Sequence, residues 1–219
     1  MTTAVLKKYK LVIFDWDGTV MDSISKIVNC IRHSALALNI EPPSDTAIKN
    51  IIGMSLELAI EVLFPEDVAH HPALINGYKQ QYRVDTTATP VFDNVENVLS
   101  ALKAQGVILA IATGKGRDGL MRLLEQTQLG HYFSATRTSD EARSKPSPDM
   151  LEQLLAELAI NADEALMIGD TKIDMAMAQA ANIDRIGVTM GVHSAAQLSE
   201  FSPVATVDNY QQLQRMLLG

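Results

Sequence analysis

Leu11-Val12-Ile13-Phe14-Asp15-Trp16-Asp17-Gly18-Thr19 is the stretch of sequence that decides the fold. Its first four residues are apolar and β-prone, and the run ends shortly before a glycine, so it predicts a short buried strand. A period of two places Asp15 and Asp17 on one side and Trp16 on the other. Carboxylates this close raise each other's pKa unless a cation lies between them or one carries a proton. Either solution indicates chemistry: a hard metal bound by oxygens, or a nucleophile beside a proton carrier.

Composition limits the function classes. The chain has 219 residues, of which 47% are hydrophobic and 20% charged, so it predicts one globular domain or a domain with an insert. A net charge of -8 argues against binding to nucleic acid or to a membrane surface, but a bound metal still allows an anionic substrate. Cys30 is the only cysteine, and the lysines of residues 1–10 precede no long apolar segment. We therefore expect a cytoplasmic protein.

Helical periodicity follows the first strand. Apolar residues at intervals of three and four predict helices from Ser23 to about Val84, with Ser23, Ser44 and Ser55 as N-caps. The His70-His71-Pro72 stretch lacks a third ligand nearby and is interpreted as an exposed turn, not a zinc site. Residues 86–90 form a linker.

Strands alternate with helices in the rest of the chain. Apolar runs predict strands near residues 107–112, 133–139, 165–168, 186–189 and 204–207. This alternation is typical of an α/β fold, a mostly parallel sheet with helices on both faces. We therefore assign residues 1–20 and 88–219 to a sheet core, and residues 21–87 to a helical insert over its carboxyl edge.

Polar residues follow three of the apolar runs. They are Asp15 with Asp17, the stretch Thr113-Gly114-Lys115, and Asp170 after Gly169; Lys145 lies in a loop before a helix. In parallel sheets, ligands bind beyond the carboxyl ends of the strands, so these groups should converge. Asp174 shares a face with Asp170 if both lie in the first turn of a helix, although a helix start also attracts a lone acid.

These four motifs, in this order, resemble those of the haloacid dehalogenase superfamily. The motifs are Asp15 to Thr19, Thr113, Lys145, and Gly169 to Asp174. The resemblance spans nearly the whole chain and is strongest to the phosphoglycolate phosphatase-like group. It implies a Rossmann-like α/β core whose helical insert is a C1-type cap.

The resemblance also implies catalytic roles. Asp15 is the expected nucleophile and forms an aspartyl-phosphate, while Asp17 is the general acid and then the base. Thr113 and Lys145 are expected to hold the phosphoryl oxygens. The implied cofactor is Mg²⁺. Its expected ligands are the carboxylates of Asp15 and Asp170, the backbone carbonyl of Asp17, and Asp174 directly or through water.

Substrate contacts are expected from both units. In the core they are Thr19, Gly114 and Lys115, although Lys115 is equally consistent with a solvated loop lysine. In the insert they are Gly53 and Ser55, which flank Met54 in a loop that resembles the family's substrate loop. Met54 itself is interpreted as part of a plain turn between helices.

Three other classes of protein use related residues. A haloacid dehalogenase needs no acid at the position of Asp17, and a phosphosugar mutase usually has a histidine near Ile27. A signalling receiver domain has its phosphorylated aspartate in mid-chain and no helical insert. The prediction is therefore a magnesium-dependent phosphomonoester hydrolase, monomeric or weakly dimeric, acting on a small phosphorylated metabolite. 2-Phosphoglycolate is implied by the resemblance; nucleotides, sugar phosphates and pyrophosphate are the alternatives.

Overall fold

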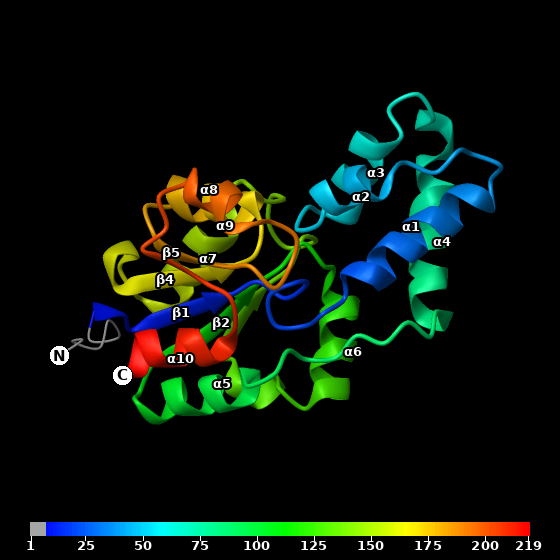
Figure 1. Ribbon diagram of the computed structural model, residues 1–219. Coiled ribbons are helices and arrows are strands. Elements are labelled where there is room, and N and C mark those ends of the chain that lie inside the picture. Colours follow the sequence, from blue (N-terminus) through cyan, green and yellow to red (C-terminus); the bar gives the residue numbers. More distant parts are fainter. Residues whose placement is uncertain (1–7) are drawn as a thin grey trace.

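A parallel sheet forms the centre of the protein. The computed structural model describes residues 8–219, so the predicted assignment of residues 1–7 to the sheet core lies outside the described residues. The six strands have the order β3-β2-β1-β4-β5-β6 and all pairs are parallel, which confirms the predicted α/β class (Figure 1). The strands are β1 (Leu11–Phe14), β2 (Ile108–Ala112), β3 (Ala135–Arg137), β4 (Ala165–Gly169), β5 (Asp184–Val188) and β6 (Ala205–Val207).

Strand β1 lies between β2 and β4. Leu11 pairs in register with Ile108 on one side and Ala165 on the other. All four β1 residues are fully buried, because helices cover both faces of the sheet. This explains why the strand is a continuous apolar run with no alternation.

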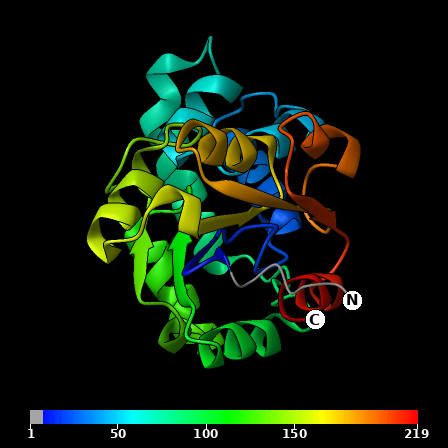
Figure 2. The same cartoon turned by 90° about the vertical axis from the view of Figure 1, so that its left-hand side faces the viewer.

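The helices form two layers around the sheet. The side of Val12 and Phe14 packs against α5, α6 and α10, and the side of Leu11 and Ile13 packs against α7 and α8. In Figure 1 and Figure 2, α5 and α10 lie below the sheet and α8 lies above it. The α-helices around the sheet are α5 (Val95–Ala104), α6 (Arg117–Thr127), α7 (Asp149–Leu158), α8 (Lys172–Ala180), α9 (Ala195–Ser199) and α10 (Tyr210–Leu218). Short 3₁₀ turns lie at Gly130–Tyr132 and Ala162–Glu164.

Helices α1 to α4 lie beside the carboxyl edge of the sheet (Figure 1), and residues 21–87, which contain them, are here called the cap segment. Its apolar residues cluster among themselves, around Ile31, Ile48 and Ile60 in one group and around Ile27 and Ile51 in another. Its helices are α1 (Ile24–Leu36), α2 (Asp45–Asn50), α3 (Leu56–Leu63) and α4 (His71–Val84), with a 3₁₀ turn at Val68–His70. Within residues 8–219, no helix is long and apolar enough to cross a bilayer.

Two local predictions about the cap segment are wrong. Ser23 precedes α1 but makes no capping hydrogen bond, because its hydroxyl is engaged elsewhere. His71 belongs to α4 rather than to a turn, since Pro72 is well suited to the first turn of a helix. The Nε2 atom of His71 lies 2.8 Å from the carbonyl oxygen of Phe64. Ser44 and Ser55 do cap α2 and α3.

The cap segment touches the core at the loop between α2 and α3. A Cβ atom on Gly114 would lie 2.3 Å from the carbonyl oxygen of Met54 and 2.4 Å from that of Gly53, so only glycine fits at this contact. The backbone N–H of Ser55 donates to the Ser144 hydroxyl at 2.8 Å. The loop therefore meets the core next to Lys145 and the end of β2.

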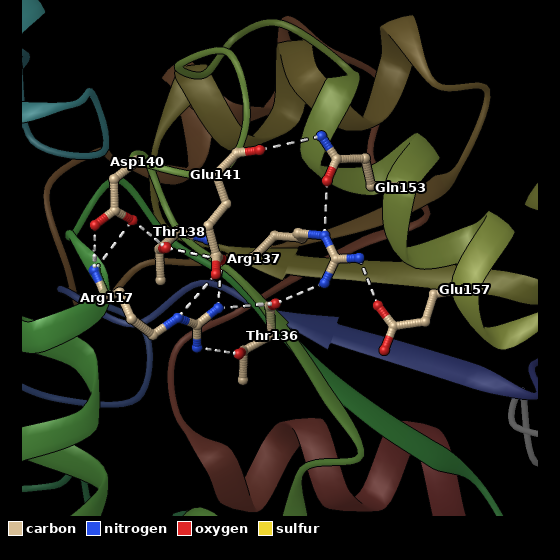
Figure 3. Close-up of polar contacts among 8 residues, drawn as sticks. All are labelled: Arg117, Thr136, Arg137, Thr138, Asp140, Glu141, Gln153 and Glu157. Carbon is tan, nitrogen blue, oxygen red and sulfur yellow. Dashed lines mark hydrogen bonds and ion pairs between the residues drawn. The ribbon is translucent and has the colours of Figure 1, made fainter.

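A polar network fixes two core loops (Figure 3). Both carboxylate oxygens of Asp140 accept from the N–H of Arg117, the first residue of α6, at 2.9 and 3.1 Å. The Arg117 side chain donates to Thr136 and to Glu141. Since Asp140 belongs to the loop that leads to Lys145, the network joins that loop to the start of α6.

Asp140 acts as a remote cap for α6, so the Asp140→Ala variant leaves the Arg117 N–H without its acceptor. We expect the free energy of unfolding to fall by about 1 kcal/mol, measured by urea denaturation. Glu61→Gln, a change at an exposed helix position, is the matched control. An Asp140→Ala protein as stable as the control would contradict the capping role.

Candidate active site

The carboxyl edge of the sheet gathers the polar motifs. Asp15 follows β1, Thr113 follows β2 and Asp170 follows β4, and these three strands are neighbours. Lys145 reaches the same place from the loop before α7. Its ammonium lies 2.6 Å from Oδ1 of Asp15 and 2.7 Å from Oδ1 of Asp174, and all of these side chains are buried.

Three buried carboxylates form a potential metal site. Asp15, Asp170 and Asp174 each offer an oxygen, and these oxygens lie within 4.8 Å of one another. Oδ2 of Asp15 is buried and has no hydrogen-bond partner among residues 8–219. Oxygen donors of this kind suit a hard divalent cation such as Mg²⁺. The free Asp15 oxygen therefore fits a site that a cation completes.

Burial and mutual repulsion dominate the electrostatics of this cluster. Burial, opposed by the charge of Lys145, raises the pKa of Asp15 to about 7. Burial, followed by the charges of Asp15 and Asp174, raises the pKa of Asp170 well above its usual value. Burial lowers the pKa of Lys145, but the attraction of Asp15 and Asp174 outweighs it and the pKa is raised. The cluster thus favours the charged form of Lys145.

Asp170 is held by two surrounding segments, residues 18–19 and residues 191–192. The hydroxyl of Thr19 donates to its Oδ1 at 3.0 Å, and the N–H of Val192 donates to its Oδ2 at 2.8 Å. Gly18 and Gly191 lie so close that a Cβ atom on either would be 2.3 Å or less from Oδ2. The orientation of this carboxylate is therefore fixed before any ligand binds.

Asp174 is oriented by the start of α8. Thr171 is the N-cap, and Oδ2 of Asp174 accepts from its N–H at 3.1 Å and from its hydroxyl at 2.6 Å. This capping box leaves Oδ1 for Lys145. The helix begins at Lys172, so the suggestion that Asp170 and Asp174 share its first turn is wrong. Asp170 approaches from the end of β4 instead.

Asp17 lies between the core and the cap segment. Its Oδ1 accepts from the Ser23 hydroxyl at 2.6 Å, and its Oδ2 lies 3.1 Å from the ammonium of Lys115. Burial lowers the pKa of Lys115, but Asp17, Tyr82 and Tyr78 together outweigh it and raise that pKa overall. Asp17 is therefore oriented by two partners that the Asp15 carboxylate does not share.

A cavity of about 260 Å³ opens beside Asp15 and Asp17, with walls from both units. Of the expected substrate contacts, Gly53, Gly114 and Lys115 line it. Met54, interpreted above as part of a plain turn, also lines it.

Two expected substrate contacts do not line this cavity. Thr19 is fully buried and its hydroxyl donates to Asp170. The hydroxyl of Ser55 accepts from the N–H of Leu58 as the cap of α3. Both hydroxyls are therefore engaged within the protein.

Other residues at the site carried no signal of this role in the sequence. Ser23 reads as an ordinary N-cap, and Tyr78 and Tyr82 read as the apolar face of a helix, but both tyrosines line the cavity. Val192 contributes only its backbone N–H, which no side-chain pattern reveals. Only the fold brings these groups to the motifs.

Known proteins are similar to this chain in sequence. Residues 12–188 match the family model for haloacid dehalogenase-like hydrolases. The chain is 34% identical over 209 residues to the probable phosphatase IndB of Dickeya dadantii (strain 3937). The alignment covers 93% of this chain and 91% of that protein. It is 26% identical to the phosphoglycolate phosphatase of Vibrio cholerae, covering 97% of this chain and 99% of that protein.

Solved structures share the fold. A hydrolase from Pseudomonas syringae superimposes with a TM-score of 0.87 at 25% identity, covering 95% of this chain and 97% of that chain. A predicted phosphatase from Clostridium acetobutylicum gives a TM-score of 0.85 at 28% identity, covering 96% and 98%. The family match covers most of the chain and includes the strands that carry Asp15, Thr113 and Asp170. This chain is therefore an enzyme of the haloacid dehalogenase-like hydrolase family, similar to its phosphoglycolate phosphatases.

Proposed function

We propose that this enzyme is a magnesium-dependent phosphomonoester hydrolase that works through an aspartyl-phosphate. The observation that carries the proposal is the free Oδ2 of Asp15, buried beside Lys145 in a cluster of carboxylates. The phosphatase names of its relatives support the same reaction class.

In the first step Asp15 attacks phosphorus. The new bond joins an Asp15 oxygen to phosphorus, and the bond from phosphorus to the alcohol oxygen breaks. Lys145 and Thr113 hold the phosphoryl oxygens, and the fixed charge of Lys145 stabilises the developing negative charge. Because these groups are buried and oriented beforehand, little rearrangement is needed at the moment of reaction.

Asp17 moves the protons. In its protonated form it gives a proton to the departing alcohol oxygen, and as a carboxylate it then takes one from the water that attacks the aspartyl-phosphate. The second step restores the Asp15 carboxylate and releases inorganic phosphate. Ser23 and Lys115 orient Asp17 for both transfers.

Mg²⁺ would be held by Asp15 and Asp170, by the backbone carbonyl of Asp17, and by Asp174 directly or through water. When bound, it supplies positive charge that offsets the carboxylates and the phosphoryl oxygens. Thr19, Val192 and Thr171 orient its carboxylate ligands.

The cap segment supplies the rest of the substrate site, since Gly53 and Met54 line the cavity opposite Gly114 and Lys115. A small phosphorylated metabolite is the substrate class, and the names of relatives make 2-phosphoglycolate the first compound to test. A cytoplasmic location, supported by the acidic composition and the lone Cys30, and a monomer or weak homodimer complete the proposal.

Asp15→Asn removes the attacking carboxylate. We expect kcat to fall by about 10⁴-fold or more in a phosphate-release assay, because no aspartyl-phosphate can form. The isosteric amide keeps the packing, so a thermal melt like that of the wild type is the control. Turnover within tenfold of the wild type would rule out Asp15 as the nucleophile.

Asp17→Asn removes the proton donor. We expect kcat/KM to fall by about 10²- to 10⁴-fold for alkyl phosphates, whose alcohols leave poorly without a proton. The loss should be much smaller for p-nitrophenyl phosphate, whose leaving group needs no proton. An equal loss for both substrates would contradict the proton-transfer role.

Mg²⁺ should stabilise the folded enzyme by relieving repulsion among the three carboxylates. At a concentration of 100 times Kd, the expected gain in the free energy of unfolding is about 2.7 kcal/mol, measured by denaturation with Mg²⁺ and with EDTA. Asp170→Asn should lose most of this gain, whereas Glu61→Gln should keep it. A full gain in Asp170→Asn would show that Mg²⁺ binds elsewhere.

A further inference from the structure

The cavity has two chemically different ends. Asp15, Asp17 and Lys115 form the polar end, where the phosphoryl group binds under the proposed function. The opposite wall comes from the cap segment and is mostly aliphatic. Its isoleucines, Ile27, Ile31, Ile51 and Ile52, are at most 7% exposed. The part of the substrate beyond phosphorus therefore meets an apolar surface.

This wall offers no unpaired buried cation for a second anionic group, since Arg83 and Arg122, which form no ion pair within residues 8–219, are both exposed. Lys115 is the one lysine or arginine of the lining that is not exposed, and it is paired with Asp17 at 3.1 Å. Lys79 is exposed and lies 3.7 Å from Glu57, which also lines the cavity. Over the whole lining, five carboxylates face four cations. A carboxylate buried against the isoleucines of this wall would thus be desolvated, and its one buried cationic neighbour, Lys115, is already paired with Asp17, which makes this burial costly.

The tyrosines of α4 add a ring surface and a polar group. Tyr78 and Tyr82 lie with ring centroids 5.7 Å apart, and both line the cavity. The Tyr82 hydroxyl is buried and has no hydrogen-bond partner among residues 8–219. Buried polar groups in native proteins are normally paired, so a ligand group or a water is the missing partner. The ammonium groups of Lys115 and Lys26 lie 4.7 and 4.8 Å from the Tyr82 ring centroid and fix its position.

We infer that the substrate of this site is a phosphomonoester of an uncharged alcohol with an extended apolar or aromatic body, which carries a hydrogen-bonding group for Tyr82. A short carboxylated alcohol such as glycolate lacks the apolar surface, and the one buried cation of the lining, Lys115, is already paired with Asp17. The cavity volume, just below the ~300 Å³ at which drug-sized pockets begin, restricts the class to metabolites. This inference rests on the proposed function and narrows it.

The test compares kcat/KM for four phosphomonoesters with the wild-type enzyme and Mg²⁺. 2-Phosphoglycolate and 2-hydroxyethyl phosphate are close in size and differ in charge. Benzyl phosphate adds an apolar ring, and uridine 5′-monophosphate adds a ring with hydrogen-bonding groups. We expect kcat/KM to rise along this order, with the two ring compounds above 2-phosphoglycolate by about tenfold or more.

Two variants separate the contributions of the wall and of the hydroxyl. Ile51→Ala should lower kcat/KM for benzyl phosphate but not for 2-hydroxyethyl phosphate, which is too short to use the wall. Tyr82→Phe should lower kcat/KM for uridine 5′-monophosphate several-fold and leave benzyl phosphate unchanged. Because each effect is a ratio between substrates, a general loss of folded protein does not imitate it.

The outcomes distinguish this inference from the proposed function. If kcat/KM for 2-phosphoglycolate equals or exceeds kcat/KM for the two ring compounds, the inference is wrong and the hydrolase proposal stands. If each variant changes kcat/KM by the same factor for all four substrates, the assigned roles of the wall and of Tyr82 are wrong. If the folded enzyme releases no phosphate from any compound, the proposed function itself fails.

Discussion

The ammonium of Lys145 between the carboxylates of Asp15 and Asp174 is the interaction on which the site depends. Isolated buried charges are very costly, and removing one partner of a buried pair leaves an uncompensated charge. One lysine cannot balance three buried carboxylates, so the ionised cluster keeps an excess of negative charge. An excess of negative charge on oxygen donors suits a divalent cation. This charge imbalance inside the protein supports the metal chemistry proposed for the enzyme.

Sheet topology is what makes this cluster possible. Because β1 lies between β2 and β4 and all three are parallel, the residues after them share one edge. The helices on both faces exclude water from the strands and leave the edge as the place where polar groups can lie. Lys145 does not directly follow a strand. It comes from the loop before α7, which Asp140 joins to the start of α6. The same edge receives the Gly53–Met54 loop, which covers the end of β2 at Gly114.

The sequence predicted what depends on local pattern. Strands buried on both faces are continuous apolar runs, so β1, β2 and β4 were evident, and Ser44 and Ser55 cap helices as their type suggests. The convergence of the motifs followed from parallel topology. The sequence could not reveal hydrogen bonds between side chains that the fold brings together. The hydroxyl of Ser23 donates to Asp17 instead of capping its own helix, and the hydroxyl of Thr19 donates to Asp170. Where a side chain has two possible hydrogen-bond partners, only the fold decides which of them it contacts.

Asp17 shows how the two units act on one reaction. Its Oδ1 is held by Ser23, at the start of the cap segment, and its Oδ2 by Lys115, in the core loop after β2. Lys115 in turn lies against the ring of Tyr82 from α4. Asp17, the proposed proton carrier, is therefore oriented by the same surfaces that line the cavity, whereas the Lys145 ammonium lies between Asp15 and Asp174 of the core. Under the proposed function, phosphoryl capture thus depends on the core, and release of the alcohol depends on how the cap segment fits it.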